Sequence, residues 1–452
     1  MATSGISSTR VAWMMALAGL AVVAAVEEVG CSSEPTLENV GGGSTQEQAL
    51  VSDNHGDPAR TGVYYDDTNL LTPANVGADG GFVEAPSRYQ VIGPIYAQPL
   101  VVPNVPLPAG NVDLLLVATT QNHLYGFDAR KPGSAPIWQI GDSDAGFGVA
   151  PNIGMNPYND GGADAHGIDN NPINCANIGN IGILSTPAVD TATNFAYVVS
   201  ASGPGGAHTF KLDAVNLTTG TIANGNGLAI LPDGDAGAIL APDGGAIAFN
   251  AGNHIQRPAL ALLKQNGKTY VIAAFSSSCD APNPFYGWIF AFDVTTPSAP
   301  QLTGIFNDSH NAPSTPQGGI WNSGAGPAID PQGNNYFLSG NGDGHDAGNV
   351  FSDSAFKLSI DSNGQFVQPT TSDASTYFTP SNWYDLQACD LDLGVSGITY
   401  IADNTTPMLL FGSKLGKAYL LNANNLGGAT PLDVKQAACV QLATRKDNGT
   451  GG

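Results

Sequence analysis

The chain has 452 residues and a formal net charge of −23, from 38 acidic side chains against 15 Lys and Arg. A surface of that sign repels phosphate backbones and argues against nucleic acid as a partner. Only 12 % of the residues are charged, whereas 57 are Gly and 31 are Pro, which is typical of a turn-rich chain and argues against a helical or coiled one.

The first thirty residues resemble a bacterial export signal. Arg10 precedes an apolar run over residues 11–26, which is shorter than a comfortable membrane span and follows the layout of a secretory signal peptide. We therefore predict that residues 1–30 are a signal peptide and that the protein is exported.

Cys31 stands in a Gly-Cys-Ser-Ser sequence directly after this signal. The order resembles a bacterial lipoprotein signal, in which the Cys becomes the acylated first residue of the mature chain, although Glu28 stands where that signal has Leu. The resemblance predicts a lipid anchor that holds the protein on a membrane surface of the cell envelope. A soluble, extracellular protein is the alternative. Residues 31–50, polar and containing Gly-Gly-Gly, are predicted to be a flexible tether.

Residues 51–452 are predicted to form one domain, because a unit of short strands and tight turns recurs along them. Its copies begin at Gln98, Thr186, Arg257, Gly318 and Ser396. Pro99, Pro187, Pro258 and Pro327 open the first four and stand 88, 71 and 69 residues apart, the first step being lengthened by an insertion.

Each copy supplies about four strands, and a four-stranded sheet repeated around an axis is a β-propeller blade. The sequence thus predicts an all-β fold, a β-propeller with five recognisable four-stranded blades. The strand that begins with Pro is expected to be innermost, because Pro is tolerated at a strand's first position and small residues such as Ala325, Gly326 and Ala328 suit crowding near the axis.

Small polar residues are predicted to end the third strand of each copy and to cap the turn that follows. They are Asp128, Asp213, Asp293, Ser359 and Asn422. Their repetition indicates side-chain to main-chain bonds in turns and argues against catalysis. By the same reasoning, Trp321 and the glycines around it belong mostly to the scaffold.

Several phrases of the chain resemble exported bacterial proteins built on the pyrroloquinoline-quinone-like β-propeller. They are DNHGDPARTGVYYDDTNLLTPANVG, YAQPLVVPNV, LLVATTQNHLYGFDA, GILSTPAVD, QRPALAL, GWIFAFD, GGIWNSGAGPAIDPQGNNYFLSGNG and DLDLGVSG with KLGKAYLLNA. Members of this family continue through further blades, so the resemblance implies an incomplete, larger propeller.

Binding residues are expected on one face of the propeller, which we call the long-loop face. It carries the loops between the second and third strands of each blade and the connections between blades, while the tight-turn face carries TATN, KQNGK and PQGN. The residues expected on the long-loop face are His123, His166, His208, His254, His310, His345, Cys175, Cys279 and Cys389. The insertion over residues 141–180 is long enough to fold over the axis there. Together with Cys439, the residues Cys175, Cys279 and Cys389 make four Cys, an even number that suits disulfides in an oxidising compartment. The alternative interpretation is that long loops simply collect polar residues.

Two classes of function follow. The resemblance implies, as one alternative, a quinoprotein dehydrogenase that oxidises an alcohol or sugar with pyrroloquinoline quinone and Ca²⁺. Its base would be Asp385, with Asp390 and Asp392 as alternatives; Arg257 and Trp321 would face the quinone, and Asn341 and Asp343 would bind Ca²⁺. The chain has no adjacent Cys-Cys pair, and the fourth-strand Trp of the repeat survives only as Trp138.

The second class, which we favour, is a binding or scaffold protein that presents its long-loop face to an unknown protein or glycan. The acidic, Gly-rich loop with Asn341, Asp343 and Asp346 could recruit Ca²⁺ in this class too, although such clusters are more often solvated turns.

Overall fold

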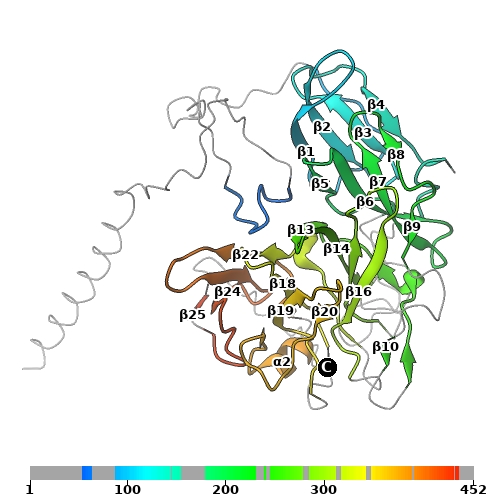
Figure 1. Cartoon of the computed structure of the whole chain (residues 1–452). Coiled ribbons are helices and arrows are strands. Elements are labelled where there is room, and N and C mark those ends of the chain that lie inside the picture. The colour runs from blue at the N-terminus through cyan, green and yellow to red at the C-terminus, as the bar shows by residue number, and fades with distance from the viewer. Residues whose placement is uncertain are drawn as a thin grey trace, which may run out of the picture. The chain divides into compact units, whose positions relative to one another are not determined.

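The computed structural model describes residues 53–63, 87–143, 145–153, 179–230, 239–240, 245–277, 285–311, 317–342, 348–388, 391–431 and 433–436 (Figure 1). All of them lie in the unit that spans Gln48–Gly452. Across these ranges, no helix has the length and hydropathy that a membrane span requires. Several predictions concern residues outside the described ranges: the signal peptide, the tether, Cys31, His166, Cys175, Cys279, Asp343, His345, Asp346, Cys389, Asp390 and Cys439.

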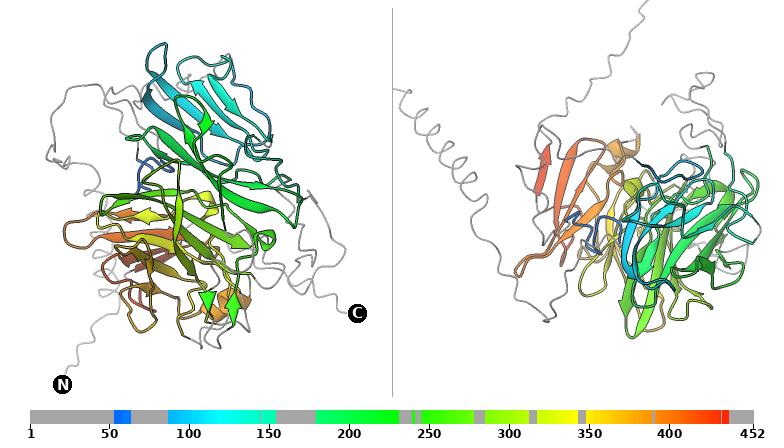
Figure 2. Two further views of the ribbon diagram at one scale, coloured as in Figure 1. Left: turned by 45° about the vertical axis from the view of Figure 1, so that its right-hand side comes forward. Right: turned by 90° about the horizontal axis from the view of Figure 1, so that it is seen from above.

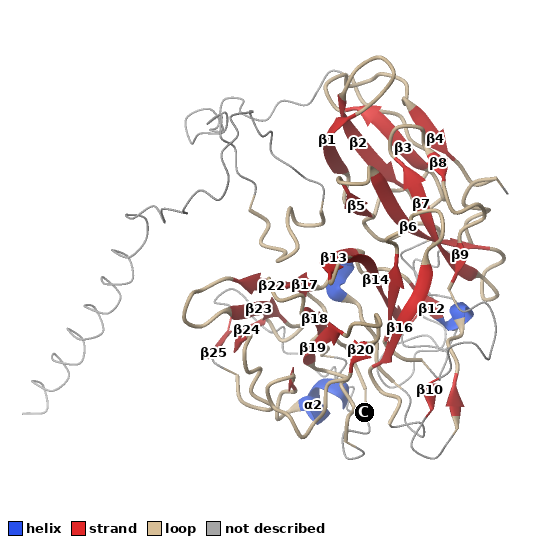
Figure 3. Ribbon diagram, in the orientation of Figure 1, coloured by secondary structure: helices blue, strands red, loops and turns tan. Residues whose placement is uncertain are grey.

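Antiparallel sheets dominate the described residues, as Figure 3 shows. The first sheet contains β1 (Leu100–Val105), β2 (Val112–Ala118), β3 (Leu124–Asp128) and β4 (Trp138–Ile140). The second contains β5 (Ala188–Asp190), β6 (Phe195–Ser202), β7 (Thr209–Asn216), β8 (Thr221–Ile222) and β9 (Leu228–Ala229). The third contains β12 (His254–Ile255), β13 (Ala261–Gln265), β14 (Lys268–Ser277), β15 (Trp288–Asp293) and β16 (Gln301–Asn307).

The fourth sheet contains β17 (Ala328–Ile329), β18 (Asn335–Leu338), β19 (Ala355–Ile360), β20 (Phe366–Val367) and β21 (Tyr377–Phe378). The fifth contains β22 (Ile398–Ile401), β23 (Met408–Gly412), β24 (Lys417–Asn422) and β25 (Asp433–Gln436). A two-stranded ribbon joins β10 (Ile239–Leu240) and β11 (Ala246–Ile247). The described helices are short: η1 (Ala251–Asn253), η2 (Asn322–Gly324) and α2 (Trp383–Ala388).

These five sheets, which we call blades 1 to 5, coincide with the five predicted repeats. In every blade the first strand pairs at one edge of the sheet; a Pro directly precedes it in blades 1, 2 and 4, and in blade 3 Pro258 lies between β12 and β13. Blade 3 divides its edge between β12 and β13, which both pair with β14. The prediction of an all-β propeller fold with five recognisable blades is therefore confirmed, although the sheets of blades 2, 3 and 4 have five strands where four were predicted.

Two of the predicted turn caps are wrong. Asp213 lies inside β7, fully buried, and the residue that ends this strand is Asn216, whose Oδ1 accepts from the main-chain N–H groups of Thr218 and Thr219. Ser359 likewise lies inside β19, and the cap is Asp361, which accepts from Asn363 and Gln365. Both third strands extend past the predicted residue, because buried apolar residues follow it: Ala214 and Val215 in β7, and Ile360 in β19.

Asp128, Asp293 and Asn422 do cap their turns as predicted. The side chains accept from the main-chain N–H groups two residues on, at Arg130, Thr295 and Asn424 respectively. The repeated polar residue at the end of the third strand is therefore a structural feature of the blades.

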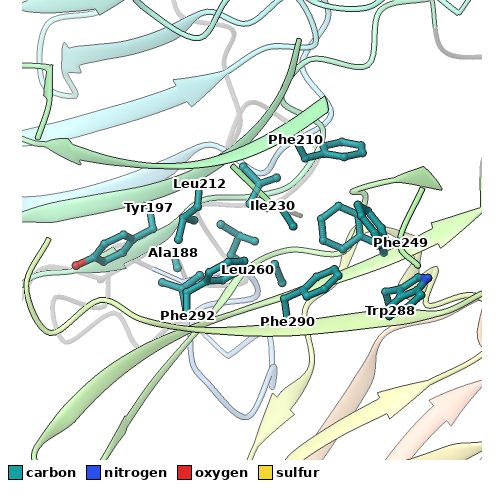
Figure 4. Packing of buried hydrophobic residues seen from close by; sticks show 14 of the residues in the cluster. Ala188, Tyr197, Phe210, Leu212, Ile230, Phe249, Leu260, Trp288, Phe290 and Phe292 are labelled. Atoms are coloured by element: carbon teal, nitrogen blue, oxygen red, sulfur yellow. The ribbon is translucent and has the colours of Figure 1, made fainter. Parts of the chain in front are cut away.

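Apolar clusters join each blade to the next. One packs blade 1 on blade 2, a second blade 2 on blade 3, a third blade 3 on blade 4 and a fourth blade 4 on blade 5. Figure 4 shows the second, in which Tyr197 and Phe210 of blade 2 face Phe290 and Phe292 of blade 3. Phe249 contacts the rings of both blades, with centroids 5.2 Å from Phe290 and 6.4 Å from Phe210. Burial of these faces stabilises the order of the blades.

A hydrogen bond accompanies three of these blade interfaces, and its acceptors occupy matching positions in the blades. Trp138 Nε1 donates to the oxygen of Leu217 at 2.8 Å, Tyr197 Oη to that of Val294 at 3.3 Å and Tyr336 Oη to that of Ala423 at 3.3 Å. Leu217, Val294 and Ala423 each come directly after the third strand of the following blade. An aromatic side chain of one blade thus satisfies the first turn carbonyl of the next.

The axis is occupied by residues 53–62, which we call the axial segment and which Figures 1 and 2 draw in blue. Asn54 Nδ2 donates to Gln98 and Thr186, at the beginnings of blades 1 and 2, over 3.2 and 3.4 Å. Main-chain N–H groups of the inner strands donate in return: Ile329 to Pro58 and Tyr400 to Ala59. With Arg60, described below, the axial segment contacts residues in or just before the inner strands of all five blades.

Candidate functional site

An apolar cluster lies on the long-loop face, where the chain enters the inner strands. Ile153, Ile181 and Leu184 belong to the predicted insertion and the connection into blade 2, Ile255 begins blade 3, and Trp321 precedes blade 4. The first four are buried and the indole of Trp321 is half-buried against them. The two described ends of the insertion therefore pack beside the residues that enter blades 2, 3 and 4.

Gly340 lies between the side chain of Trp321 and that of Asp392, another of the predicted residues. A Cβ on Gly340 would stand 3.0 Å from Trp321 Cδ1 and 3.0 Å from Asp392 Oδ1, so a larger residue at this position would crowd both. The structure thus places Trp321, Asn341 and Asp392 beside one another. This much of the predicted site is brought together.

Asp392 is buried, 5 % exposed, and its carboxylate is engaged on both oxygens. Oδ1 accepts from the main-chain N–H of Asn341 at 2.8 Å, and Oδ2 lies 2.6 Å from Lys414 Nζ. Lys414 follows β23 of blade 5, so this ion pair ties the loop after β18 to the fifth blade. A carboxylate held in this way serves as a structural anchor.

The other two predicted residues, Asp385 and Arg257, make no hydrogen bond or ion pair with this cluster among the described residues. Asp385 lies in the first turn of α2 with an exposed side chain. Arg257 precedes Pro258 and is half-buried, and no hydrogen bond or ion pair between described residues joins it to Trp321, Asn341 or Asp385. The proposed assembly of Arg257, Asn341 and Asp385 around one ligand remains a prediction.

Four of the five described histidines, all except His55 of the axial segment, lie on the long-loop face and contact main-chain oxygens. Nδ1 of His123 and of His310 lie 2.8 and 3.1 Å from the oxygens of Gln121 and Asn307. His208 Nε2 lies 3.1 Å from the oxygen of His254. His254 has carbonyl oxygens at both ring nitrogens, Asn250 at 2.7 Å and Tyr286 at 3.1 Å. Burial lowers the pKa of His254 to about 4 and also lowers that of His208.

Asp308 is a fully buried carboxylate that the sequence did not single out. It accepts from the main-chain N–H groups of Gly287 at 2.9 Å and Gly319 at 3.0 Å, and from Ser309 Oγ at 2.6 Å. A Cβ on Gly287 would stand 2.2 Å from its Oδ2, so glycine is required there. Burial raises the pKa of Asp308 to about 7. Asp308, with Ser309, Gly287 and Gly319, forms what we call the Asp308 cradle, which joins the residue before β15 to Gly319, two residues before Trp321.

Arg60 in the axial segment is the second residue that was missed, although it is one of only six arginines. Its side chain is 1 % exposed. It donates to the oxygens of Asn54, Leu260 and Pro327 at 2.8, 3.3 and 3.0 Å and pairs with Asp53 Oδ1 at 3.3 Å. Burial raises the pKa of Asp53, and the charge of Arg60 opposes that shift.

The described residues give no support to the quinone and Ca²⁺ that the resemblance implies, and Asp343 lies outside them. Trp321 has an apolar wall beside it, and no polar contact connects Arg257 to it. Ca²⁺ takes six to eight oxygen ligands, whereas Asp392 already holds the ammonium group of Lys414. Across the described ranges, no three His, Cys, Asp or Glu side chains are grouped closely enough to hold a metal ion. These residues therefore support no reaction that passes through either group.

A scan of protein-family models and a search of curated proteins each returned no match. Among solved structures, a europium-containing methanol dehydrogenase matches with a TM-score of 0.54 and 13 % identity over 86 % of this chain and 58 % of its own. A quinohemoprotein alcohol dehydrogenase from Comamonas testosteroni has a TM-score of 0.46, with 16 % identity over 88 % of this chain and 50 % of its own. BamB from Moraxella catarrhalis has a TM-score of 0.32, with 14 % identity over 75 % of this chain and 78 % of its own.

The chain thus spans about half the length of the two dehydrogenases, 58 % and 50 %. At these identities the likeness concerns the fold alone. Five antiparallel blades, packed in chain order and superposable on the methanol dehydrogenase, show a β-propeller of the pyrroloquinoline-quinone-like type.

Proposed function

We propose that the protein is an exported, lipid-anchored β-propeller of the bacterial cell envelope that acts as a binding or scaffold protein through its long-loop face. One observation carries this proposal. Polar side chains of that face are engaged in bonds that hold loops in place, namely Asp392 with Lys414, and His123, His208, His254 and His310 with main-chain oxygens. A face organised in this way offers a shaped surface to a partner.

Exposed apolar side chains mark where a partner would contact this face. Val149, in the connection between blades 1 and 2, and Tyr384, on α2 between blades 4 and 5, are each 65 % exposed. Tyr is enriched at protein interfaces, because its ring buries a large area and its hydroxyl still reaches a polar partner. The net charge of −23 argues for a protein or glycan and against a polyanion.

The test uses the mature, purified protein on arrays of envelope proteins and bacterial glycans. We expect a ligand whose binding weakens about tenfold in Tyr384→Ser, the effect of losing one central interface residue. Val367→Ser is the matched control, because Val367 is also exposed, at 52 %, but lies in β20 at the outer edge of blade 4. Equal binding by wild type and both variants would contradict the use of the long-loop face.

The dehydrogenase alternative is tested by adding pyrroloquinoline quinone and Ca²⁺ to the same protein. We expect no change in the absorbance of the quinone and no dye reduction with a panel of alcohols and sugars. Substrate-dependent dye reduction that disappears in Asp385→Asn would establish the enzyme and overturn the binding proposal.

The anchor is tested separately by mass spectrometry of the membrane fraction. The expected N-terminus is an acylated Cys31, because the Gly-Cys-Ser-Ser sequence follows the apolar run. An unmodified N-terminus elsewhere, with the protein free in the medium, would contradict lipid anchoring and leave the binding proposal intact.

A further inference from the structure

A pocket of about 540 Å³ opens on the tight-turn face, between the axial segment and the inner strands of blades 3, 4 and 5. Its walls are apolar at Leu262, Leu263 and Ile329, and Tyr400 adds an aromatic ring. Leu263, Ile329 and Tyr400 are buried, whereas Pro58 and Lys264 are exposed and stand at the mouth. Pockets that hold small molecules have this size and mostly apolar walls with a few polar groups.

The charged residues of this pocket are mainly acidic. Asp53 and Asp57 come from the axial segment, Asp330 from the turn after β17, and Lys264 from the end of β13. Lys264 is already paired with Asp190 at 2.6 Å, and Asp53 with Arg60 at 3.3 Å. Counting these partners, four carboxylates stand against two cations, so the pocket keeps an excess of negative charge.

The three lining carboxylates differ in how far their oxygens are occupied. Asp330 accepts from Gln332, Asn334 and Tyr336 at 2.7 to 3.0 Å, so its charge acts on a ligand from a distance. Asp57 has one donor on each oxygen, the main-chain N–H of Thr61 on Oδ1 and its hydroxyl on Oδ2, whereas each oxygen of Asp330 has two. Asp53 Oδ2 accepts no hydrogen bond from any described residue, and its side chain is 18 % exposed. Asp53 and Asp57 are therefore the residues that a cationic group would meet.

The spacing of these carboxylates favours an organic cation over a metal ion. Within the ranges that the structure covers, no three acidic, His or Cys side chains come close enough together to share one metal. An ammonium group on an apolar body satisfies both features, because the body lies against Leu262, Leu263 and Ile329 while the charge faces the axial segment. Tyr400 adds an aromatic ring, which attracts cations.

We propose that this pocket, between the axial segment and the inner strands of blades 3 to 5, binds a small organic ammonium ion with an apolar body. The site is independent of the proposed function, because it lies on the face opposite the long loops. It uses no side chain that was predicted from the sequence as a site residue.

The test is a charge series on the mature wild-type protein by isothermal titration calorimetry and ligand-observed NMR. The probes are 2-phenylethylammonium, neutral 2-phenylethanol and anionic 3-phenylpropanoate, which share a phenyl body. We expect the ammonium ion to bind about tenfold more tightly than the alcohol, because a charge-assisted hydrogen bond is about twice as strong as a neutral one. The carboxylate should not bind.

Two variants locate the site. Asp57→Asn should weaken 2-phenylethylammonium binding about five- to tenfold by removing one charge, and Leu262→Phe should weaken it by filling space. The control is Asp361→Asn, which removes an exposed turn cap of blade 4 outside the pocket and should leave binding unchanged. Equal affinity for the amine and the alcohol, binding unaffected by both pocket variants, or no binding at millimolar concentration would each overturn the proposal.

Discussion

Arg60 Nε donates a hydrogen bond of 3.0 Å to the main-chain oxygen of Pro327, a residue 267 positions later in the chain. The guanidinium group also holds Asp53, Asn54 and Leu260, so one buried cation connects the axial segment to the inner strands of blades 3 and 4. The stability of the axis therefore depends on this side chain, which suggests the first experiment.

Arg60→Met should lower the free energy of unfolding by about 3 kcal/mol, because it leaves the half-buried carboxylate of Asp53 and three carbonyl oxygens without their donor. Urea denaturation followed by tryptophan fluorescence measures the change. Arg130→Met is the matched control: that side chain is 65 % exposed and pairs with Asp113 at 2.6 Å. A surface pair contributes less than about 1 kcal/mol, so similar losses in both variants would contradict the assigned role of Arg60.

Trp138→Phe should destabilise the interface of blades 1 and 2 by about 1 to 3 kcal/mol, the cost of leaving a buried polar group unsatisfied. The indole donates to Leu217, and a Cβ on Gly126 or Gly220 would stand 2.5 Å from it, so the ring fits tightly. Tyr384→Phe, at a side chain that is 65 % exposed, provides the comparison and should unfold like wild type. Thermal and urea unfolding distinguish the two.

The free energy of unfolding should decrease between pH 6.5 and pH 4 because of the protonation of His254. Burial lowers the pKa of His254 from 6.5 to about 4, so the unfolded chain takes up a proton first as the pH falls. The stabilisation is fully present above pH 6.5 and is lost toward pH 4. The advantage of wild type over His254→Gln should therefore shrink by about 3 kcal/mol across this window.

The comparison with a variant is needed because Asp308 acts in the opposite direction. Burial raises the pKa of Asp308 from 3.8 to about 7, so its contribution decreases as the pH rises through that range. Wild type and His254→Gln both contain Asp308, so its contribution cancels in the difference between their urea midpoints. A difference that stays constant from pH 7.5 to pH 4.5 would show that His254 is not neutral in the folded protein.

Lys414→Met should lower the free energy of unfolding by about 2 kcal/mol, because Asp392, 7 % exposed in its side chain, loses a cation at 2.6 Å. The matched control is Lys131→Met. The side chain of Lys131 is 73 % exposed and pairs with Asp128 at 2.7 Å. We expect that control to change stability by less than about 0.5 kcal/mol. Equal effects on urea unfolding would indicate that the Asp392 pair is no stronger than a surface pair.

The blades could be predicted from the sequence because their signals are local and repeated. A Pro at the beginning of the inner strand and a polar cap after the third strand recur at similar spacing, and Pro187 and Asp293 stand where the pattern places them. The pattern could not fix the length of individual strands. Asp213 was misassigned because β7 continues through three further residues, of which Ala214 and Val215 are buried like Asp213 itself.

The axial segment and the Asp308 cradle could not be predicted, because their partners are main-chain atoms. Arg60 donates to carbonyl oxygens of Leu260 and Pro327, and Asp308 accepts from the N–H groups of Gly287 and Gly319. Every residue has such atoms, so no residue type marks them. The glycines around Asp308 were visible in the sequence, but their reason, space for a carboxylate, depends on contacts between distant loops.

The position of the axial segment has a consequence for folding kinetics. The segment precedes every blade in the chain, yet Thr399 of blade 5 donates to Arg60 across 339 positions. Contacts between residues so far apart in the sequence form slowly, because closing the intervening chain costs conformational entropy before the contact contributes any stabilising free energy. The residues that leave the ribosome before any blade therefore reach their native place only after the fifth blade has been made, and refolding should end with a slow phase in which the axis fills.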